Sequence, residues 1–509
     1  MARSAHGGLG VSFRVETRSG TLLGESDAGA SVWRGIPFAA PPVGPLRWKA
    51  PQPVVPWAGV RDVTRFGAVA PQPSARNAGG VPASVRRDED CLTLNIWSPG
   101  APSQLSGLGL CPVVVWFHGG AQMQGAGSMA DYSGRALALA GDLVVVTVNY
   151  RLAALGQLDL SSLGRRAGFD SNLGLRDQVA ALEWVRDHIA SFGGDANRVT
   201  IMGESAGGTA ITTLLALPAA AGLFRGAIAQ SPAPTAVYGR EGHAERAVEL
   251  LELLGLETGD VKRLRHVPTD ALVAAGTRLA GRNARERPGT LAFGPVVDGT
   301  YLPEHPIDVF AEGRATPVPL LIGTNRDEAN LFIRSDPPIL PVKETALRDM
   351  LRMFVPESAP SIVEAYGRLR SRGDRLGLSG DWSFTIPSLR VADGHAAVAP
   401  TFMYRFDHAT PATRAAGLGA THGTEIPYVF GNLGGPIGKL VLLLGGRRAA
   451  RTLSQSMQAH WISFIRSGDP GWGRYDADRT TRVFATRTVD QRHPAAGRLP
   501  VWDDVGLHL

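Results

Sequence analysis

The sequence predicts an α/β fold in which a mostly parallel central sheet carries helices on both faces. Short apolar runs rich in β-branched residues recur along the chain, as is typical of strands buried on both faces. A stretch with apolar residues at helical spacing separates two of these runs. Helical patterns without intervening strands, from about Glu241 to Asn283 and from Val342 to Leu378, indicate large insertions above the sheet. Such insertions commonly form lids and pocket walls.

The expected elements follow in chain order. The first hundred residues are rich in Pro and Gly, which indicates an irregular apron over the sheet with short strands such as residues 92–97. A helix is predicted over residues 173–192, where apolar residues recur every three or four positions before a Gly-Gly-Asp break. Six buried strands are predicted at residues 112–117, 143–148, 198–202, 226–230, 318–323 and 401–406.

Composition excludes several classes of protein. Of the 509 residues, 44% are apolar and 19% are charged, and both fractions are typical of globular proteins. With no internal repeat or separating linker, we expect one enlarged domain over residues 1–509, although length alone permits more. The net charge of +6 is spread along the chain without a run of five or six like charges. We therefore expect neither a nucleic-acid nor a membrane partner, and no cofactor.

Cysteine usage and the first residues favour a cytoplasmic protein. Cys91 and Cys111 are the two cysteines, too few for a disulfide framework in a chain of this size. The beginning of the chain lacks the apolar core of a signal peptide, and no stretch approaches the ~18 apolar residues of a membrane span. Of 52 basic residues four are lysine, which indicates GC-rich coding and a bacterial source. Both a monomer and a homodimer fit these features.

Ser205 is the first candidate for chemistry. It stands in Gly203-Glu204-Ser205-Ala206-Gly207, after the predicted strand 198–202 and before an apolar stretch. A strand, a sharp turn and a helix force such a serine into a strained, exposed position, and the helix N-terminus presents N–H groups to an oxyanion. A glycine-rich turn without chemistry is the alternative. The context favours a nucleophile that cleaves carboxylic esters through an acyl-enzyme.

The turn Phe117-His118-Gly119-Gly120-Ala121 is the second candidate. It follows the predicted strand 112–117 directly and precedes the serine in the chain. Glycines after a strand often form a plain turn, but in this fold class such a turn presents main-chain N–H groups to the serine. Gly120 and Ala121 are therefore expected to join Ala206 in stabilising an oxyanion.

A nucleophilic serine needs a base and a carboxylate that orients the base. His422 lies in a Gly-rich loop after the predicted strand 401–406, and His118 is the other candidate base. Asp327 and Glu328 both follow the predicted strand 318–323, and spacing does not choose between them. Serine, then acid, then histidine is the chain order of the α/β-hydrolase fold.

The sequence resembles the type-B carboxylesterases, the family that includes cholinesterases and bacterial para-nitrobenzyl esterases. The likeness runs nearly end to end and is most specific in the block that ends in Gly-Glu-Ser-Ala-Gly-Gly. It rests on residues 34–48, 89–97, 113–121, 148–156, 172–208, 323–332 and 422–431. The resemblance implies an α/β-hydrolase fold and a triad of Ser205, Glu328 and His422, with Gly120, Ala121 and Ala206 as oxyanion donors, acting on small-molecule esters.

The chain departs from the family pattern at several positions. Ala70 stands where the family usually has the cysteine that pairs with the one in Glu-Asp-Cys-Leu, so Cys91 is expected to be unpaired. Gln122 and Gln157 each replace a usual Phe, so the family does not define the polarity of this pocket, and Ala329 replaces a usual Gly. Relatives whose oxyanion turn reads Gly-Gly-Ala accept bulky alcohol groups, so Ala121 implies broad specificity and a roomy alcohol site.

Other functions fit less well. No His-Glu-X-X-His, paired Cys-X-X-Cys or calcium-loop pattern supports a metal site. Residues 434–439 (Gly-Gly-Pro-Ile-Gly-Lys) approach a nucleotide loop, but Leu433 and Leu440 break the pattern, and we expect a plain loop. An adhesion module of this fold would lack the nucleophile. An acyltransferase or an amide or carbamate hydrolase with the same triad is the stronger alternative.

Overall fold

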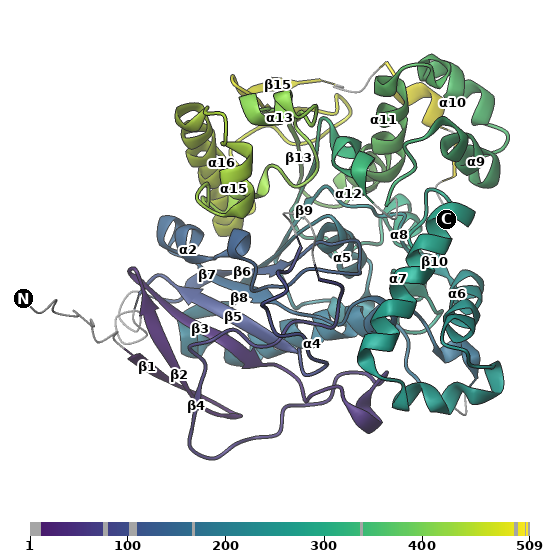
Figure 1. Cartoon of the computed structure of the whole chain (residues 1–509). Coiled ribbons are helices and arrows are strands. Elements are labelled where there is room, and N and C mark those ends of the chain that lie inside the picture. Colours follow the sequence, from purple (N-terminus) through teal and green to yellow (C-terminus); the bar gives the residue numbers. More distant parts are fainter. Residues whose placement is uncertain are drawn as a thin grey trace, which may run out of the picture.

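A single large sheet organises the structure, a computed structural model that describes residues 12–74, 80–100, 109–164, 168–335, 339–492, 497–503 and 505–506 (Figure 1). The sheet has 13 strands in the order β1-β2-β3-β5-β7-β6-β8-β9-β12-β13-β14-β15, with β4 paired to β2. From β7 to β14 every neighbouring pair is parallel. The predicted mostly parallel central sheet is confirmed.

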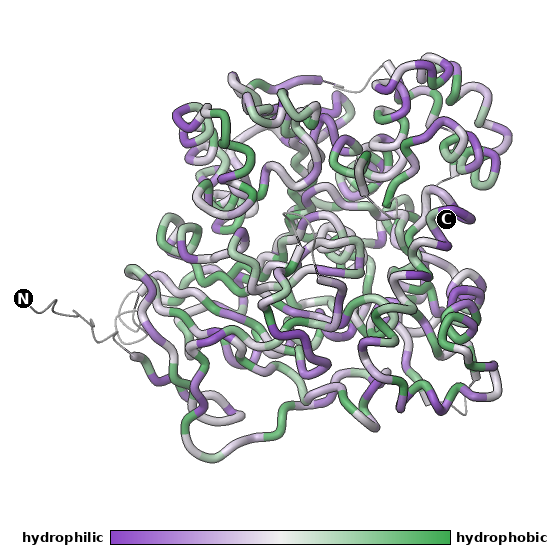
Figure 2. Tube along the Cα trace, viewed as in Figure 1, coloured by the Kyte–Doolittle hydropathy of each residue, from purple (hydrophilic) through white to green (hydrophobic). Residues whose placement is uncertain are grey.

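The seven strands expected from the sequence all form, with ends shifted by a few residues. Their side chains are almost entirely buried because the sheet is covered on both faces, and apolar residues predominate along them (Figure 2). They are β5 (Thr93–Ser98), β6 (Cys111–Phe117), β7 (Val144–Val148), β8 (Gly194–Glu204), β9 (Gly226–Gln230), β12 (Leu320–Asn325) and β13 (Thr401–Phe406). Next to β13, the strands β14 (Thr481–Phe484) and β15 (Val489–Gln491) complete one edge of the sheet.

The N-terminal segment corrects one expectation. Its first part is not an apron over the sheet but an antiparallel extension of it, formed by β1 (Ser12–Thr17), β2 (Gly20–Asp27) and β3 (Ala30–Pro37), which leads to β5. Ala28 and Gly29 both have positive φ, 45° and 96°, as a tight hairpin turn between twisted strands requires. The described residues 38–74 and 80–92 are largely irregular, as predicted, apart from a 3₁₀ turn (Gly44–Leu46) and the short strand β4 (Val60–Asp62).

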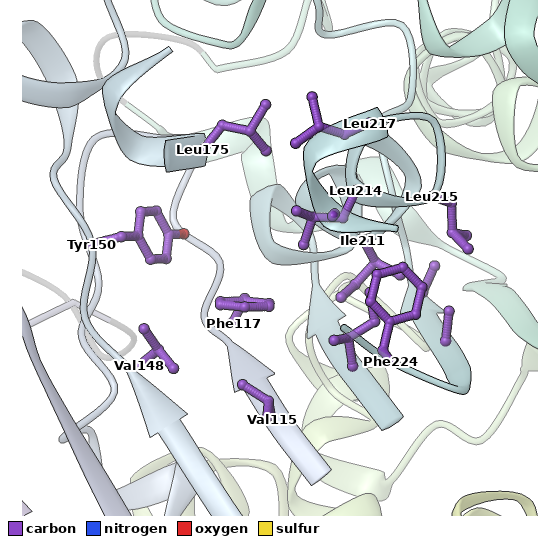
Figure 3. Close-up of a cluster of buried hydrophobic side chains, with 14 of the residues drawn as sticks. Val115, Phe117, Val148, Tyr150, Leu175, Ile211, Leu214, Leu215, Leu217 and Phe224 are labelled. Carbon is purple, nitrogen blue, oxygen red and sulfur yellow. The ribbon is translucent and has the colours of Figure 1, made fainter. Parts of the chain in front are cut away.

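Helices cover both faces of the sheet. Val113 and Val115 of β6 belong to one buried apolar cluster with residues of α4 (Leu173–His188), α5 (Ala206–Leu215) and α12 (Ile386–Ala396). The alternate residues Val114 and Trp116 pack with α2 (Arg135–Gly141) and α16 (Arg447–Ser467) on the other face. Figure 3 shows the first of these layers, where Val115, Phe117 and Val148 of the strands lie beside Leu175 and Ile211 of the helices.

Helix α4 confirms the helix predicted after residue 172. It continues into a 3₁₀ turn, Ile189–Phe192, and the chain leaves the turn at Gly193 with φ of 85°. Gly193 adopts this left-handed conformation without the steric cost of a Cβ, so the chain turns sharply into β8.

The two predicted insertions are helical and lie toward the right of the view in Figure 1. The first contains α6 (Arg240–Leu253) and α7 (Thr269–Glu286), and the second contains α9 (Glu344–Phe354), α10 (Ala359–Ala365) and α11 (Arg372–Gly380). Gly380 lies beside Glu328, because a Cβ on it would stand 3.5 Å from the Cβ of that residue. The second insertion therefore reaches the carboxyl ends of the parallel strands.

The sequence predicts a plain loop at residues 434–439, and this prediction is wrong. Helix α15 (Pro436–Val441) begins within them, and the preceding Gly435 is extended. Proline favours the first position of a helix, because that position needs no backbone donor. In the part of the chain that the structure describes, no helix has both the length and the apolar character needed to cross a membrane.

Candidate active site

Ser205 occupies a sharp turn between β8 and α5. Its φ of 58° and ψ of −121° are backbone angles that L-residues seldom adopt, so the turn is strained. Its N–H donates a hydrogen bond to the Gln230 carbonyl, 2.9 Å away, which anchors the turn to β9. A Cβ on Gly203 would stand 2.5 Å from the Gly207 backbone, and one on Gly207 would overlap the Phe117 carbonyl. The two glycines of the motif therefore allow the turn to close against β6.

The second glycine-rich turn lies directly beside the serine. A Cβ on Gly119 would come within 2.9 Å of the Ser205 Cβ, so only glycine fits there. Gly120 and Ala121 follow with positive φ, 121° and 53°. Ala206 is the first residue of α5, and N–H groups in a first helical turn have no partner within the helix. Gly119 thus brings the second glycine-rich turn against Ser205, and Ala206 follows the serine directly at the start of α5.

His422 and Glu328 meet, although 94 residues separate them in the chain. Nδ1 of His422 lies 2.6 Å from Oε2 of Glu328, and both side chains are buried. The other oxygen of Glu328 accepts hydrogen bonds from Ser231 Oγ at 2.6 Å and from the Asn325 N–H at 2.7 Å. Because both carboxylate oxygens are held, the imidazole has a fixed orientation.

The two alternative residues have other surroundings. Asp327 accepts a hydrogen bond from the Ala420 N–H at 2.8 Å and pairs with Arg326, so it anchors the loop before His422. His118 is buried, and its ring stacks on that of Tyr150, with the centroids 4.4 Å apart. Burial lowers the pKa of His118 to about 4. Neither residue contacts Ser205 through a hydrogen bond in the structure.

Glu204 is a neighbour of His422 that the sequence argument did not identify. Oε1 of Glu204 lies 3.2 Å from Nε2 of His422, the nitrogen that would face a nucleophile. The structure gives no hydrogen bond between Ser205 Oγ and this nitrogen. Catalytic hydrogen bonds of this kind often tighten only when substrate is bound. The signal was available, because Glu204 immediately precedes the serine in the motif.

Burial and like charge set the electrostatics of this cluster. Burial raises the pKa of Glu204 to about 8. Burial alone would lower the pKa of His422, but the carboxylates of Glu204 and Glu328 outweigh it and raise that pKa to about 9. The imidazole is therefore strongly basic in the resting enzyme.

Glu425 is a further buried carboxylate that the sequence argument missed. It accepts hydrogen bonds from Gln230 Nε2 at 3.0 Å and from Asn325 Nδ2 at 2.6 Å. Burial raises its pKa. Asn325 also donates to the Thr421 carbonyl at 2.8 Å, so the network connects the end of β12 to the loop that carries His422.

Aromatic rings cover the imidazole. The Phe384 ring lies 4.6 Å from that of His422 and the Phe332 ring 5.2 Å, measured between centroids. Phe384 belongs to a π-helical turn, Asp381–Thr385, that joins α11 to α12. Both rings belong to a buried apolar cluster with Ala329 and Leu340. The segments on either side of the second insertion thus supply an apolar wall on one side of His422.

The remaining departures from the family pattern have clear environments. Cys91 is buried and unpaired beside the buried Ala70, as expected, and Cys111 is also free. Gln122 is buried and its Oε1 has no hydrogen-bond partner in the structure. Gln157 is buried too, and its Nε2 donates to the Arg151 carbonyl at 3.2 Å. Among the described residues, no group of three or more His, Cys, Asp or Glu side chains could hold a metal ion.

Comparison with known proteins agrees with this geometry. The Carboxylesterase family matches residues 12–486. The chain is 39% identical to the para-nitrobenzyl esterase of Bacillus subtilis (strain 168), over 94% of this chain and 96% of that protein. It is 37% identical to the phenmedipham hydrolase of Pseudarthrobacter oxydans, over 90% of each chain.

Solved structures are equally similar. A PNB esterase has a TM-score of 0.86 at 36% identity, with 96% of this chain and 99% of that chain covered. A carboxylesterase of Geobacillus stearothermophilus has a TM-score of 0.84 at 38% identity, with 96% and 100% covered. The predicted α/β-hydrolase fold is therefore confirmed. The chain belongs to the carboxylesterase family and is a carboxylic ester hydrolase.

Proposed function

We propose that Ser205 is the nucleophile, His422 the general base and Glu328 the acid that orients it. The observation that carries this assignment is the 2.6 Å contact between His422 Nδ1 and Glu328 Oε2, beside a serine in a strained turn. Glu328 accepts a hydrogen bond from the Nδ1–H group in this contact, which leaves Nε2 free to receive a proton.

Hydrolysis then proceeds in two halves. His422 Nε2 takes the Ser205 hydroxyl proton as Oγ bonds to the ester carbonyl carbon, whose π electrons move to the oxygen. When the tetrahedral intermediate collapses, the bond to the alcohol oxygen breaks and the imidazolium returns the proton to that oxygen. Water next attacks the acyl-enzyme and gives its proton to His422, and the acid leaves as Ser205 regains a proton.

The oxyanion is stabilised by main-chain donors. We assign this role to the N–H groups of Gly120, Ala121 and Ala206, supported by the contact of Gly119 with Ser205 and by the position of Ala206 at the start of α5. Donors that are already in position need no reorganisation as charge develops on the oxygen, so they lower the barrier.

Replacing the nucleophile tests the assignment. Ser205→Ala should lower turnover of p-nitrophenyl esters by about 10⁶-fold, because triad members act as a unit. A serine-reactive phosphonate should label the parent enzyme once per chain and leave Ser205→Ala unlabelled in intact-mass spectra. Ser361→Ala, at an exposed serine, is the matched control and should keep both turnover and label. Undiminished turnover in Ser205→Ala would show the scheme to be wrong.

We also propose broad specificity with a roomy alcohol site. Support comes from Ala121, a small residue in the oxyanion turn, and from the apolar wall of Phe332 and Phe384. Kinetics with acetate esters of a primary and a tertiary alcohol provide the measurement. We expect hydrolysis of both, and complete inactivity on the tertiary ester would contradict a roomy site.

The organisation of the chain supports two further proposals. The 13 strands of the large sheet come from residues between 12 and 491, so we propose that residues 1–509 act as a single enlarged catalytic domain. Cys91 and Cys111 are free thiols, which supports a cytoplasmic location.

A further inference from the structure

An exposed apolar surface lies where α15 ends and α16 begins. Leu440, Leu443 and Leu444 are 51%, 73% and 59% exposed, and the last two are the most exposed leucines among the described residues. Four exposed cations flank them in the chain. We call this surface the leucine–arginine patch, and it consists of Lys439, Leu440, Leu443, Leu444, Arg447, Arg448 and Arg451.

The patch has a single sign of charge. Between Glu425 and Asp469 the sequence contains no Asp or Glu. Within the described part of the chain, none of the four cations forms an ion pair. Asp131 is the acid that contacts α15, but it is buried and accepts from the Ile437 N–H at 2.9 Å, at the opposite end of the helix.

A neighbouring helix extends the positive charge. Thr410 Oγ1 donates to the Val441 carbonyl, and a Cβ on Gly446 would stand 3.2 Å from Pro411. These contacts hold α13 (Pro411–Ala415), which carries the exposed Arg414, against the patch. Figure 1 shows α13, α15 and α16 together in the upper left part of the view.

Exposed leucines and unpaired cations together indicate one kind of partner. A single exposed leucine is ordinary, but adjacent leucines surrounded by cations match a surface that is apolar inside and anionic at its boundary. Arginine and lysine near an anionic bilayer are attracted to its headgroups, and leucine side chains gain by leaving water. An acidic protein would satisfy the cations but has no need of three exposed leucines.

We propose that the leucine–arginine patch docks the enzyme on an anionic lipid surface. Leu443 and Leu444 enter the boundary between headgroups and acyl chains, and Arg447, Arg448 and Arg451 contact the phosphates. Peripheral docking of this kind involves neither a run of like charges nor a membrane-spanning helix. It goes beyond ester hydrolysis and stands independently of the triad assignment, because no patch residue belongs to the catalytic cluster.

Vesicle sedimentation with the full chain tests the proposal. At low salt, vesicles of phosphatidylglycerol and phosphatidylcholine should bind the enzyme at least tenfold more strongly than vesicles of phosphatidylcholine alone. Raising the salt concentration should weaken binding, because exposed charges are screened. Equal binding to both kinds of vesicle, or no binding to either, would overturn the proposal.

Paired variants locate the surface. Arg447→Gln with Arg448→Gln should weaken binding about 25-fold, since each cation near an anionic surface contributes about fivefold. Leu443→Ser with Leu444→Ser should weaken it at least tenfold. Arg285→Gln with Arg474→Gln removes the same charge at exposed sites elsewhere and should leave binding unchanged. All variants should keep the parent's turnover of a soluble ester, which shows that they fold.

Competition separates a lipid surface from an acidic protein. Polyglutamate should displace the enzyme from vesicles only weakly, and the leucine variants should bind polyglutamate as the parent does. If the leucine variants bind anionic vesicles as well as the parent, the patch is a site for an acidic polypeptide and lipid docking is wrong. If the arginine variants bind vesicles as the parent does, the leucine–arginine patch is not the lipid-docking surface.

Discussion

Together with Glu328, Glu204 raises the pKa of His422. Its carboxylate lies 3.2 Å from Nε2 and raises the pKa of His422, which stands at about 9. A base must be deprotonated to accept the serine proton, so activity rises with pH as the imidazolium loses its proton. We therefore expect Glu204 to contribute to the acidic limit of the pH range in which the enzyme works.

Neutralising Glu204 should move that limit to lower pH. In Glu204→Gln the carboxylate that favours imidazolium is gone, so the pKa of His422 falls. We expect the acidic limb of the kcat/KM profile to move down by about one pH unit. The profile should be measured with an ester that does not titrate, and exposed Glu344→Gln should leave the limb in place. A limb that moves upward, or stays, would disprove this role for Glu204.

The choice of acid is a second residue-scale prediction. Glu328→Gln should lower kcat about 10⁴-fold, because an amide no longer holds the histidine tautomer that the serine needs. Asp327→Asn keeps an oxygen that can accept from the Ala420 N–H and should cost less than about tenfold. Matched kinetics on one ester compare the two variants. A greater loss at Asp327 would reverse the assignment.

The residues alone did not show which carboxylate is the partner of His422. Asp327 and Glu328 are adjacent, and spacing says nothing about which carboxylate turns toward a loop that lies more than 90 residues later. The resemblance to the family named Glu328, and the geometry brings that residue to His422. Glu204 and Glu425 stand in the recognised motifs, but the sequence did not predict that their side chains are buried.

The tight turn between β8 and α5 depends on contacts among three elements. Gly203 at the end of β8 and Gly207 in the first turn of α5 face each other, and both approach the carbonyl of Phe117 at the end of β6. Phe117 is followed directly by the proposed oxyanion turn, His118 to Ala121. Small residues at these positions therefore let the turn that carries Ser205 approach the proposed oxyanion turn.

Gly207→Ala should disrupt this arrangement. The added methyl group would overlap the Phe117 carbonyl, so α5 and β6 must separate. We expect the free energy of unfolding to fall by about 2–3 kcal/mol and ester turnover to fall with it. Gly259→Ala, at an exposed glycine with no atom within 4 Å of the added Cβ, should change stability by less than about 0.5 kcal/mol. Urea denaturation of both variants makes the comparison. Parent-like stability in Gly207→Ala would contradict this role.

Some elements were harder to predict than others. The buried parallel strands are continuous apolar runs, and their pattern is visible in the sequence. Strands β1 and β2 are partly exposed, so their apolar residues are scattered, and the Ala28–Gly29 turn is a weaker hairpin signal than Asn-Gly. Helix α15 was missed because its six residues are too few for a helical period.

Across the whole molecule, a buried ion pair connects distant segments. Arg151, which follows β7, forms a bidentate pair with Asp177 of α4, with contacts of 2.7 and 2.8 Å. Its remaining guanidinium nitrogen donates to the Lys49 carbonyl at 2.7 Å. One side chain thus joins the sheet, a covering helix and the irregular N-terminal segment.

Removing one charge from this pair should destabilise the protein. Asp177→Asn leaves the Arg151 guanidinium buried without a counter-charge, so we expect the free energy of unfolding to fall by about 3–5 kcal/mol. Glu344→Gln breaks an exposed ion pair with Arg348 and should cost less than about 1 kcal/mol. Thermal and urea unfolding of the two variants test the difference. Equal effects would show that burial of the Arg151 pair is unimportant.

The sequence by itself determined the α/β alternation, the serine turn and the short set of candidate acids and bases. These features are local, because periodicity and glycine spacing act on neighbouring residues. The tertiary structure decided which carboxylate meets His422, that Glu204 shares its buried site, and that three leucines remain exposed among cations. Such pairings depend on strand order and on loop conformations, and no local pattern specifies where segments far apart in the chain will meet.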